Sequence, residues 1–148
     1  PGKLITVWIA LTNTGEKNGG IEFISGSHKW KRLSKPVKNF FGGKNYKYSL
    51  KKFKKNISTK SVVPKLKAGS ISFHHGNLWH GSNMNKSNKD RISISCHFMP
   101  INSRFHPKNN NPTLSHYKKF TTSEMDDNFF PILWGKGNVR SKFLSKLK

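Results

Sequence analysis

Alternation of apolar and polar residues in three separate stretches is the feature that most constrains the fold of this chain. Residues 3–11, 70–75 and 91–98 each alternate with period two, so that every second side chain faces the same side. Stretches of this kind form β-strands that show one face to apolar surroundings and the other to more polar ones. The chain is therefore expected to be built mainly of β-strands.

The strand predicted at residues 3–11 has two different faces. One face carries the hydroxyl of Thr6 and the indole of Trp8, and is able to line a pocket. The other is wholly apolar and must be covered by another part of the protein; it consists of Ile5, Val7, Ile9 and Leu11. Residues 13–20 are dense in turn formers and residues 21–24 return as a strand, which predicts a hairpin of the two strands.

Residues 69–100 concentrate the side chains that are able to do chemistry. They hold four of the seven histidines, the single cysteine and one of the four arginines. The Gly, Asn, Ser and Asp content of residues 81–90 predicts a turn between two antiparallel strands. Because His80 stands at the head of this turn and Arg91 at its end, we expect a histidine and an arginine on neighbouring strands of one sheet.

The formal net charge of +22 invites a nucleic-acid-binding interpretation. However, lysine supplies 24 of the 28 basic residues, whereas arginine is the residue that most often reads bases or stacks on them. The lysines come with many asparagines, a pairing that AT-rich codon usage produces without selection for binding. We therefore expect a solvated basic surface and no specific nucleic-acid partner; a basic nucleic-acid-binding or anion-binding module stays open as an alternative.

The hydrophobic content and the cysteine count indicate in what environment the protein works. A hydrophobic content of 33% is lean for a self-sufficient core, so part of the apolar surface is expected to need a partner. No apolar run approaches the roughly 18 residues that span a bilayer, and a single cysteine fits a reducing compartment. We expect a soluble, cytoplasmic protein with no membrane partner, and, because a strand pattern follows Pro1 directly, the C-terminal part of a longer chain.

Two segments fall outside the strand pattern. Residues 29–60 contain eleven lysines and no sustained period, and are expected to form a long basic insertion, either a lid on the substrate side or a mobile surface loop. After Pro100 the pattern stops. Residues 105–148 are expected to form a C-terminal arm that packs on the domain formed by residues 1–104.

A closed zinc site is one chemistry that the histidines and the cysteine suggest. Its candidate ligands are His74, His75, His80, Cys96 and His97. A zinc site needs side chains that converge, but adjacent residues of a strand point to opposite faces. At most half of the five candidates are therefore able to meet.

A second possibility needs only His80 as a metal ligand from this stretch, with Arg91 close by. A guanidinium within a sheet has a reason to be there if it meets an anion such as a carboxylate; the alternative is that Arg91 closes a hairpin through Asp90 or a neighbouring carbonyl group. One metal-binding imidazole and one carboxylate-binding arginine on a small barrel are what a non-haem iron, 2-oxoglutarate-dependent oxygenase requires.

The sequence around these two residues resembles a known family. Residues 78–83, Leu-Trp-His-Gly-Ser-Asn, followed by Arg91 eleven residues after the histidine, look like the second-histidine and 2-oxoglutarate-arginine motif of the phytanoyl-CoA dioxygenase family. The N-terminal blocks at residues 7–11, 18–21 and 25–29 are similar to the family's strand, turn and loop in the same order. The resemblance covers residues 4–98 in all.

The resemblance implies a fold and a site. The fold is a double-stranded β-helix, a relative of the jelly roll. The site has His80 as the distal Fe(II) ligand and catalytic residue, and Arg91 as the partner of the distal carboxylate of 2-oxoglutarate. Ser82 and Trp8 fall at positions where the family contacts the same co-substrate.

The His-x-Asp motif that supplies the family's other two iron ligands is absent from the 148 residues. The resemblance thus implies a fragment of a dioxygenase that hydroxylates a small molecule with O₂ while 2-oxoglutarate is decarboxylated to succinate, and the fragment alone is expected to be inactive. A halogenase-type relative, in which a small residue replaces the carboxylate ligand, and a non-catalytic cupin-like binding domain stay open.

Overall fold

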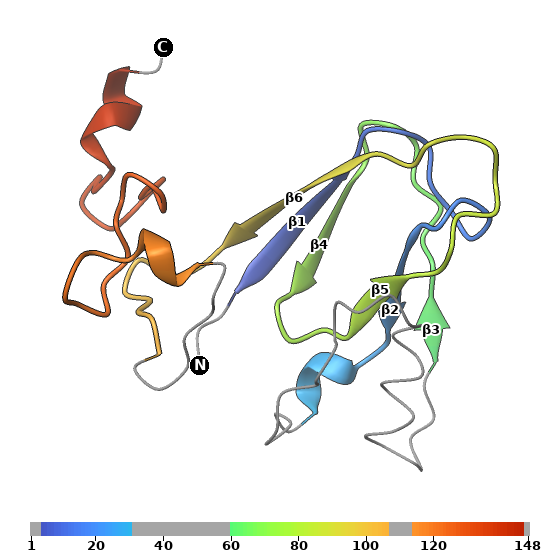
Figure 1. The fold of residues 1–148 in the computed structure, drawn as a ribbon, viewed down its shortest axis with the longest axis horizontal. Helices are drawn as coiled ribbons and strands as arrows, with labels where there is room; N and C mark the ends of the chain where they lie inside the picture. Colours follow the sequence, from blue (N-terminus) through green and yellow to red (C-terminus); the bar gives the residue numbers. More distant parts are fainter. Residues whose placement is uncertain (1–3, 31–59, 107–113, 147–148) are drawn as a thin grey trace. The chain divides into compact units, whose positions relative to one another are not determined.

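The computed structural model describes residues 4–30, 60–106 and 114–146 (Figure 1). The chain divides into two compact units, residues 3–98 and residues 1–2 with 99–148. Most of the predicted basic insertion, residues 29–60, lies outside the described residues.

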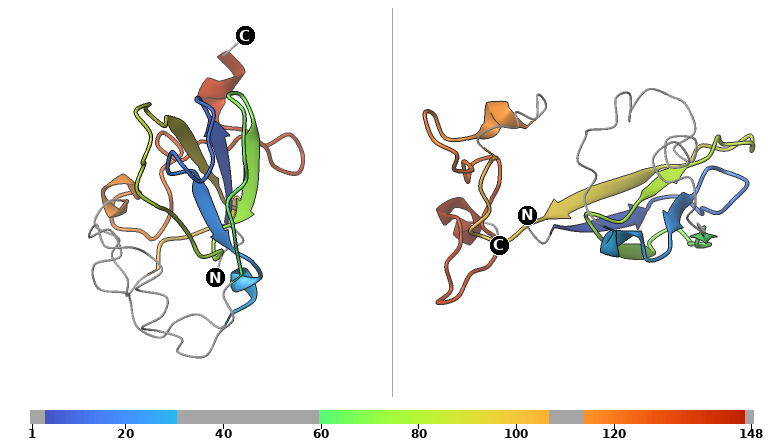
Figure 2. Two further views of the ribbon diagram at one scale, coloured as in Figure 1. Left: turned by 90° about the vertical axis from the view of Figure 1, so that its right-hand side faces the viewer. Right: turned by 90° about the horizontal axis from the view of Figure 1, so that it is seen from below.

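Six antiparallel strands make up the first unit in the part of the chain that is described (Figure 1 and Figure 2). They form two three-stranded sheets, with the orders β4-β1-β6 and β3-β2-β5. Their bounds are β1 Ile5–Ala10, β2 Ile21–Ile24, β3 Ser61–Val62, β4 Ile71–His75, β5 His80–Ser82 and β6 Ser93–Phe98. From β3 onward, successive strands alternate between the sheets, as in a jelly roll. The predicted all-β, jelly-roll class is confirmed.

Two predicted strand relationships are wrong. β1 and β2 do not form a hairpin, because they belong to different sheets. His80 and Arg91 do not lie on neighbouring strands of one sheet either: His80 begins β5 of the second sheet, and Arg91 precedes β6 of the first. Hairpin loops usually have about 2–5 residues, whereas residues 11–20 and 83–92 are long enough to carry the chain from one sheet to the other.

β1 is the central strand of the first sheet and defines its two faces. Its Trp8 and Ala10 are buried and pack against Ile21 of β2 to form the hydrophobic core of the unit. The opposite, apolar face stays partly exposed, with Ile5 at 48% and Phe73 of β4 at 70%. This is the face that the sequence predicts to need a cover, and an apolar sheet surface of this kind is typical of an interface.

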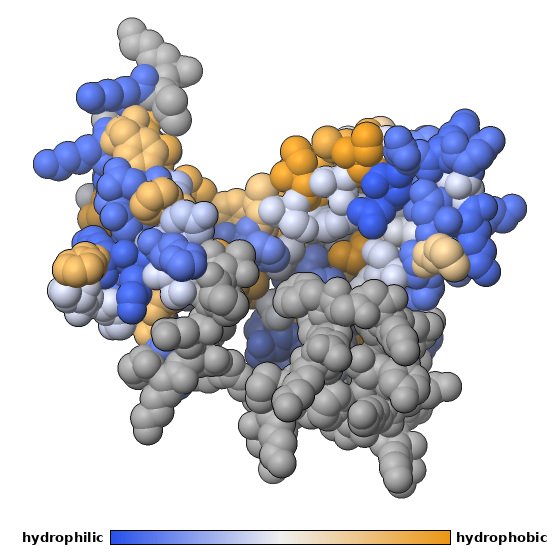
Figure 3. Space-filling model, in the orientation of Figure 1, coloured by the Kyte–Doolittle hydropathy of each residue, from blue (hydrophilic) through white to orange (hydrophobic). Residues whose placement is uncertain are grey.

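The hydropathy of the surface agrees with this division. Figure 3 shows a hydrophobic area along the upper edge of the first unit, beside the hydrophilic surface of the loops to its right. Exposed apolar residues contributed by the first sheet are Ile5, Ile71, Phe73, Ile94 and Phe98. Part of the chain's limited number of hydrophobic residues therefore lies on the outer surface of this unit.

Helical structure among the described residues is limited to 3-10 turns. They are η1 Ser27–Lys29, η2 Ser115–Tyr117 and η3 Lys142–Lys146. Within the described ranges, no helix has the length and apolar character needed to cross a membrane.

The second unit holds η2 and η3 and otherwise little regular structure where it is described. Aromatic contacts hold its segments together: the ring centroids of Phe105 and Phe130 are 5.9 Å apart, and those of Tyr117 and Phe129 are 4.8 Å apart. The packing of a C-terminal arm on the first unit stays a prediction.

Candidate functional site

The two sheets of the first unit face each other across an interior that contains aromatic and imidazole rings. The ring centroid of His74 on β4 lies 4.9 Å from that of Phe23 on β2 and also 4.9 Å from that of His80 on β5. The face of the first sheet that carries His74 therefore meets the face of the second sheet that carries Phe23 and His80. We call this space the barrel interior.

His80 has the hydrogen bonding expected of a metal-binding imidazole. It begins β5, where it pairs with Phe23 of β2. Its Nδ1 donates a hydrogen bond to the carbonyl oxygen of Leu78 over 2.8 Å. A neutral imidazole that carries its proton on Nδ1 has its lone pair on Nε2, and a backbone carbonyl is a common partner that orients metal-binding histidines. The tautomer thus leaves Nε2 able to bind a metal ion.

Arg91 lies over the ring of Trp8, which is also predicted to contact the co-substrate. Its Cζ is 5.9 Å from the ring centroid, and its Nη1 donates a hydrogen bond to Oγ of Ser93 over 2.9 Å. No ion pair joins Arg91 to Asp90 or to any other acid in the described ranges. A half-buried guanidinium held by a neutral hydroxyl and an aromatic face is well suited to receive an anion.

The strand register divides the barrel interior into two levels. On the first level, Thr6 of β1 pairs with His74 on one side and with His97 of β6 on the other. Oγ1 of Thr6 and Nδ1 of His97 share a hydrogen bond of 2.9 Å. The second level begins at Trp8, two residues further along β1, which corresponds to about 6.6 Å of strand.

Ser82 belongs to the second level. It pairs with Ile21 of β2, and Ile21 packs against Trp8 in the core. The side chain of Ser82 is exposed. Of the four predicted site residues, the structure brings Arg91 and Trp8 together. The ring contact places His80 at the level of His74, and pairing with Ile21 relates Ser82 to the level of Trp8. A contact of Ser82 with the co-substrate stays a prediction.

The five zinc candidates do not share one face. His74 is buried in the barrel interior, whereas Nδ1 of the adjacent His75 accepts a hydrogen bond from the backbone N–H of Asn77 over 3.0 Å. In the part of the chain that the structure describes, no group of three or more His, Cys, Asp or Glu side chains is arranged to hold a metal ion. A metal ion at His80 therefore needs ligands from outside the described residues.

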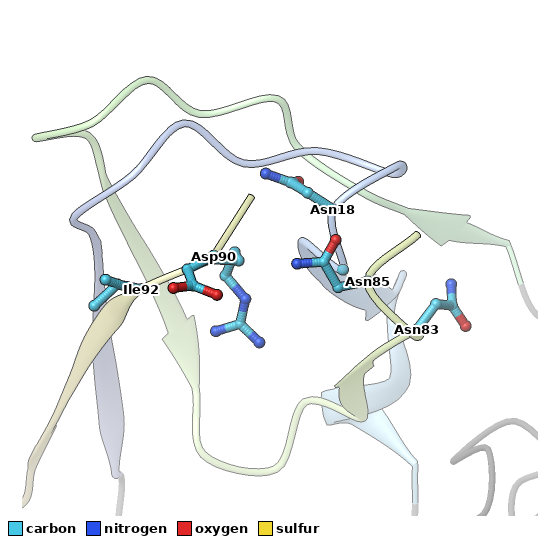
Figure 4. A pocket seen from close by; sticks show the side chains of 7 residues that line it. Asn18, Asn83, Asn85, Asp90 and Ile92 are labelled. Carbon is cyan, nitrogen blue, oxygen red and sulfur yellow. The ribbon is translucent and has the colours of Figure 1, made fainter. Parts of the chain in front are cut away.

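An open polar pocket of about 360 Å³ lies beside Arg91, between the loops that precede β2 and β6 (Figure 4). Figure 4 shows Asn18 and Asn85, one from each loop, at the same opening. Both amides are already engaged: Nδ2 of Asn18 donates to the carbonyl of Asn13, and Nδ2 of Asn85 donates to that of Lys89. These amides hold the loops in shape. The charged groups of the lining are Asp90 and Arg91, and of these Arg91 is the one suited to bind an anion.

Sequence reasoning considered His74 only as a zinc candidate and missed its place beside His80. His74 is 7% exposed, and neither ring nitrogen has a hydrogen-bond partner among the described residues. Burial, together with the imidazoles of His80 and His97, lowers the pKa of His74 to about 4. The sequence signal that could have indicated this position is the alternation that puts His74 on the same strand face as Ser70 and Ser72.

The low pKa of His74 predicts that the metal-free protein loses stability as the pH falls from about 6.5 to about 4. In the unfolded chain this histidine takes up a proton near pH 6.5, whereas in the folded protein it does so only near pH 4. The contribution of this histidine to the free energy of unfolding is therefore complete above this pH window. It is lost as the pH falls through the window, by up to about 3 kcal/mol. Chemical denaturation on both sides of the window measures the loss. Because carboxylates titrate there too, His74→Phe is the control, and an unchanged pH dependence in that variant would contradict the assignment.

Comparison with known proteins gives a family match. The family model for phytanoyl-CoA dioxygenase (PhyH) matches residues 1–93. The peroxisomal phytanoyl-CoA dioxygenase of Bos taurus is 29% identical over 103 residues, which cover 69% of this chain and 30% of that protein. Dioxygenase cdmD of Talaromyces verruculosus is 30% identical over 111 residues, covering 72% of this chain and 31% of that protein. The chain thus spans about 30% of the length of these relatives.

Solved structures with a similar fold include two from nogalamycin biosynthesis. The non-heme alpha ketoglutarate dependent carbocyclase SnoK has a TM-score of 0.59 at 21% identity, over 83% of this chain and 46% of that one. The epimerase SnoN in complex with Fe³⁺, alpha ketoglutarate and nogalamycin RO has a TM-score of 0.52 at 23% identity, over 71% of this chain and 38% of that one. At these identities the likeness concerns the fold.

The family match covers both His80 and Arg91 and extends over more than half of the chain. It confirms the resemblance found in the sequence motifs. The chain belongs to the phytanoyl-CoA dioxygenase family.

Proposed function

We propose that the 148 residues are the part of a non-haem Fe(II)- and 2-oxoglutarate-dependent dioxygenase that supplies one iron ligand and the binding group for the co-substrate. The observation that carries this proposal is that one unit contains both His80 and Arg91 in suitable states. Nε2 of His80 is left able to bind a metal, and Arg91 has no acidic partner in the described ranges. A site for iron and 2-oxoglutarate needs one group that binds a metal cation and one that binds a carboxylate anion.

The remaining iron ligands have to come from additional chain. The described residues hold no three-ligand group, the sequence contains no His-x-Asp motif, and the relatives are about three times as long as the matched segment. We use the term assembled oxygenase for the 148 residues together with the chain that supplies these ligands.

Each predicted site residue has a physical role in this proposal. Nε2 of His80 binds Fe(II), while the Leu78 carbonyl keeps the ring in the required tautomer. The guanidinium of Arg91 binds the distal carboxylate of 2-oxoglutarate through two parallel hydrogen bonds, and the Trp8 ring supports its plane. The Ser82 hydroxyl donates to the same carboxylate. When bound, iron and 2-oxoglutarate supply O₂ activation, with decarboxylation to succinate and hydroxylation of the substrate.

The substrate class follows from the same chemistry. We propose that a small molecule and O₂ are the partners of the assembled oxygenase, with no specific nucleic acid and no membrane, and that it acts in the cytoplasm, where a single unpaired cysteine stays reduced. The alternative of a halogenase-type reaction differs at the carboxylate iron ligand, which the 148 residues do not contain.

The isolated 148-residue chain is expected to be inactive and to bind Fe(II) weakly, because one imidazole cannot hold the ion. The assembled oxygenase is expected to bind Fe(II) tightly and to release succinate from 2-oxoglutarate in the presence of O₂. Anaerobic calorimetry measures the metal binding of both proteins, and a succinate assay measures the turnover. Tight, stoichiometric Fe(II) binding by the isolated chain would contradict the proposal and favour the multi-histidine site. Failure of the assembled protein to consume 2-oxoglutarate would contradict it as well.

A further inference from the structure

We infer that His74 is a co-substrate-binding residue, whose imidazole donates a hydrogen bond to the 2-oxoglutarate carboxylate at the iron end of the site. This inference rests on the proposed function and adds to it a residue that the family resemblance does not assign. Three observations on the first unit carry it: the burial of His74, the lack of hydrogen-bond partners for its ring, and its position relative to His80 and Trp8.

The His74 imidazole is buried without satisfying either of its nitrogens. It is 7% exposed, and both Nδ1 and Nε2 lack a hydrogen-bond partner in the described residues. Buried polar side chains are nearly always paired, because an unpaired buried donor or acceptor destabilises the folded protein. A buried polar group in this condition calls for a partner beyond the described residues, either a ligand or an ordered water molecule.

The position of the ring favours a ligand bound next to His80. The two imidazole centroids are 4.9 Å apart, and the Phe23 ring lies 4.9 Å from His74 and 6.4 Å from His80. His74 is thus held against an apolar ring and directly beside the residue proposed to bind iron. A ligand of a metal ion held by His80 would lie within reach of this ring.

The two levels of the barrel interior match the two ends of 2-oxoglutarate. His74 lies on the level of Thr6, and the guanidinium carbon of Arg91 lies over the ring of Trp8, two residues further along β1. Two residues of strand measure about 6.6 Å, a separation that a five-carbon dicarboxylate is able to bridge. With its distal carboxylate on Arg91, the other end of the co-substrate falls on the level that His74 shares with His80.

The neighbouring histidine provides a matched control. His75 is adjacent in β4, points to the opposite face of the sheet, and accepts a hydrogen bond from Asn77. A change of imidazole to phenyl keeps a flat ring and removes both nitrogens. His74→Phe and His75→Phe therefore make the same chemical change on the two faces of one strand, in the barrel interior and outside it.

The test compares these variants in the assembled oxygenase under anaerobic conditions. His74→Phe is expected to weaken 2-oxoglutarate binding about ten- to a hundredfold, because a hydrogen bond to a charged group is lost. Its Fe(II) affinity without 2-oxoglutarate is expected to stay unchanged. His75→Phe is expected to bind both as the parent protein does. Calorimetry gives the affinities, and the visible charge-transfer absorption of the Fe(II)–2-oxoglutarate complex reports independently on how the co-substrate sits at the metal.

Thermal unfolding adds a readout that separates a ligand contact from a structural role. Without ligands, His74→Phe is expected to melt at the same temperature as the parent or higher, because an unsatisfied buried group has been removed. The rise in melting temperature that 2-oxoglutarate produces is expected to shrink in this variant and not in His75→Phe. Asn and Gln carry an amide donor near the positions of Nδ1 and Nε2 respectively, so one of His74→Asn and His74→Gln is expected to recover part of the affinity.

The outcomes distinguish this inference from the proposed function. If the parent binds 2-oxoglutarate and Arg91→Ala weakens it while His74→Phe does not, the His74 contact is absent and a water molecule satisfies the ring. Loss of Fe(II) binding in His74→Phe without 2-oxoglutarate would instead make His74 a metal ligand and overturn the inference. If the parent does not bind 2-oxoglutarate at all, the proposed function fails and the inference fails with it.

Discussion

His80→Ala is expected to abolish succinate release by the assembled oxygenase at every concentration of 2-oxoglutarate. The change removes the imidazole ring. In the parent protein, Nδ1 of this ring donates to the Leu78 carbonyl, which leaves Nε2 able to bind a metal. Loss of one of three protein ligands opens the coordination shell of the iron, which more co-substrate cannot repair. Succinate release, followed with and without substrate, measures the effect, and anaerobic calorimetry with Fe(II) measures the metal binding.

The control for this change is His75→Ala, which removes an imidazole from β4 of the first sheet, next to His74 and on the opposite face of the strand. His75 is half-buried and its Nδ1 contacts only the backbone of Asn77. This variant is expected to keep both Fe(II) affinity and turnover. A His80→Ala protein that still releases succinate would show that the iron ligand has been assigned to the wrong residue.

Arg91→Ala is expected to raise the apparent KM for 2-oxoglutarate by about ten- to a hundredfold or more. Charged hydrogen bonds contribute about 1.5–3 kcal/mol each, and about 1.4 kcal/mol corresponds to a factor of ten. Arg91→Lys restores the charge without the planar fork and is expected to raise the KM less. Steady-state kinetics over a wide range of 2-oxoglutarate gives both values, with kcat recovering at saturation because the iron ligands are intact.

Arg104→Ala is the matched control for Arg91, because it removes the same side chain from the second unit. Arg104 is exposed and has an acidic partner, with its Nη2 at 3.6 Å from Oε1 of Glu124. An exposed pair of this kind contributes little to stability, so the variant is expected to keep the KM of the parent. An unchanged KM in Arg91→Ala would return Arg91 to a structural role in its loop.

The candidate site residues and the faces of the first strand could be proposed from local sequence patterns. Alternation assigned Thr6 and Trp8 to one face of β1 and Ile5 to the other, and the structure buries the first face and exposes Ile5 at 48%. This works because successive residues of a strand point to opposite sides whatever the strand pairs with. The spacing of His80 and Arg91 identified the family, which the family match confirms.

Strand pairing escaped prediction for a physical reason. The turn-rich residues 11–20 predicted a hairpin, yet β1 pairs with β4 and β6, which lie more than sixty residues further along the chain. Turn-forming residues mark where a strand ends, but they do not say whether the chain folds back in the same sheet or crosses to the opposite one. That choice depends on contacts with strands that local periodicity does not encode.

By itself, the sequence determined that this protein is a β-structure of the phytanoyl-CoA dioxygenase family, and it named His80, Arg91, Trp8 and Ser82, because residue order and spacing within each strand and loop carry that information. Only the tertiary structure decided that the His74 ring lies 4.9 Å from His80 with no partner among the described residues. The two residues sit on strands of opposite sheets, so their contact arises from the packing of one sheet on the other, which brings together side chains that no spacing along the chain relates.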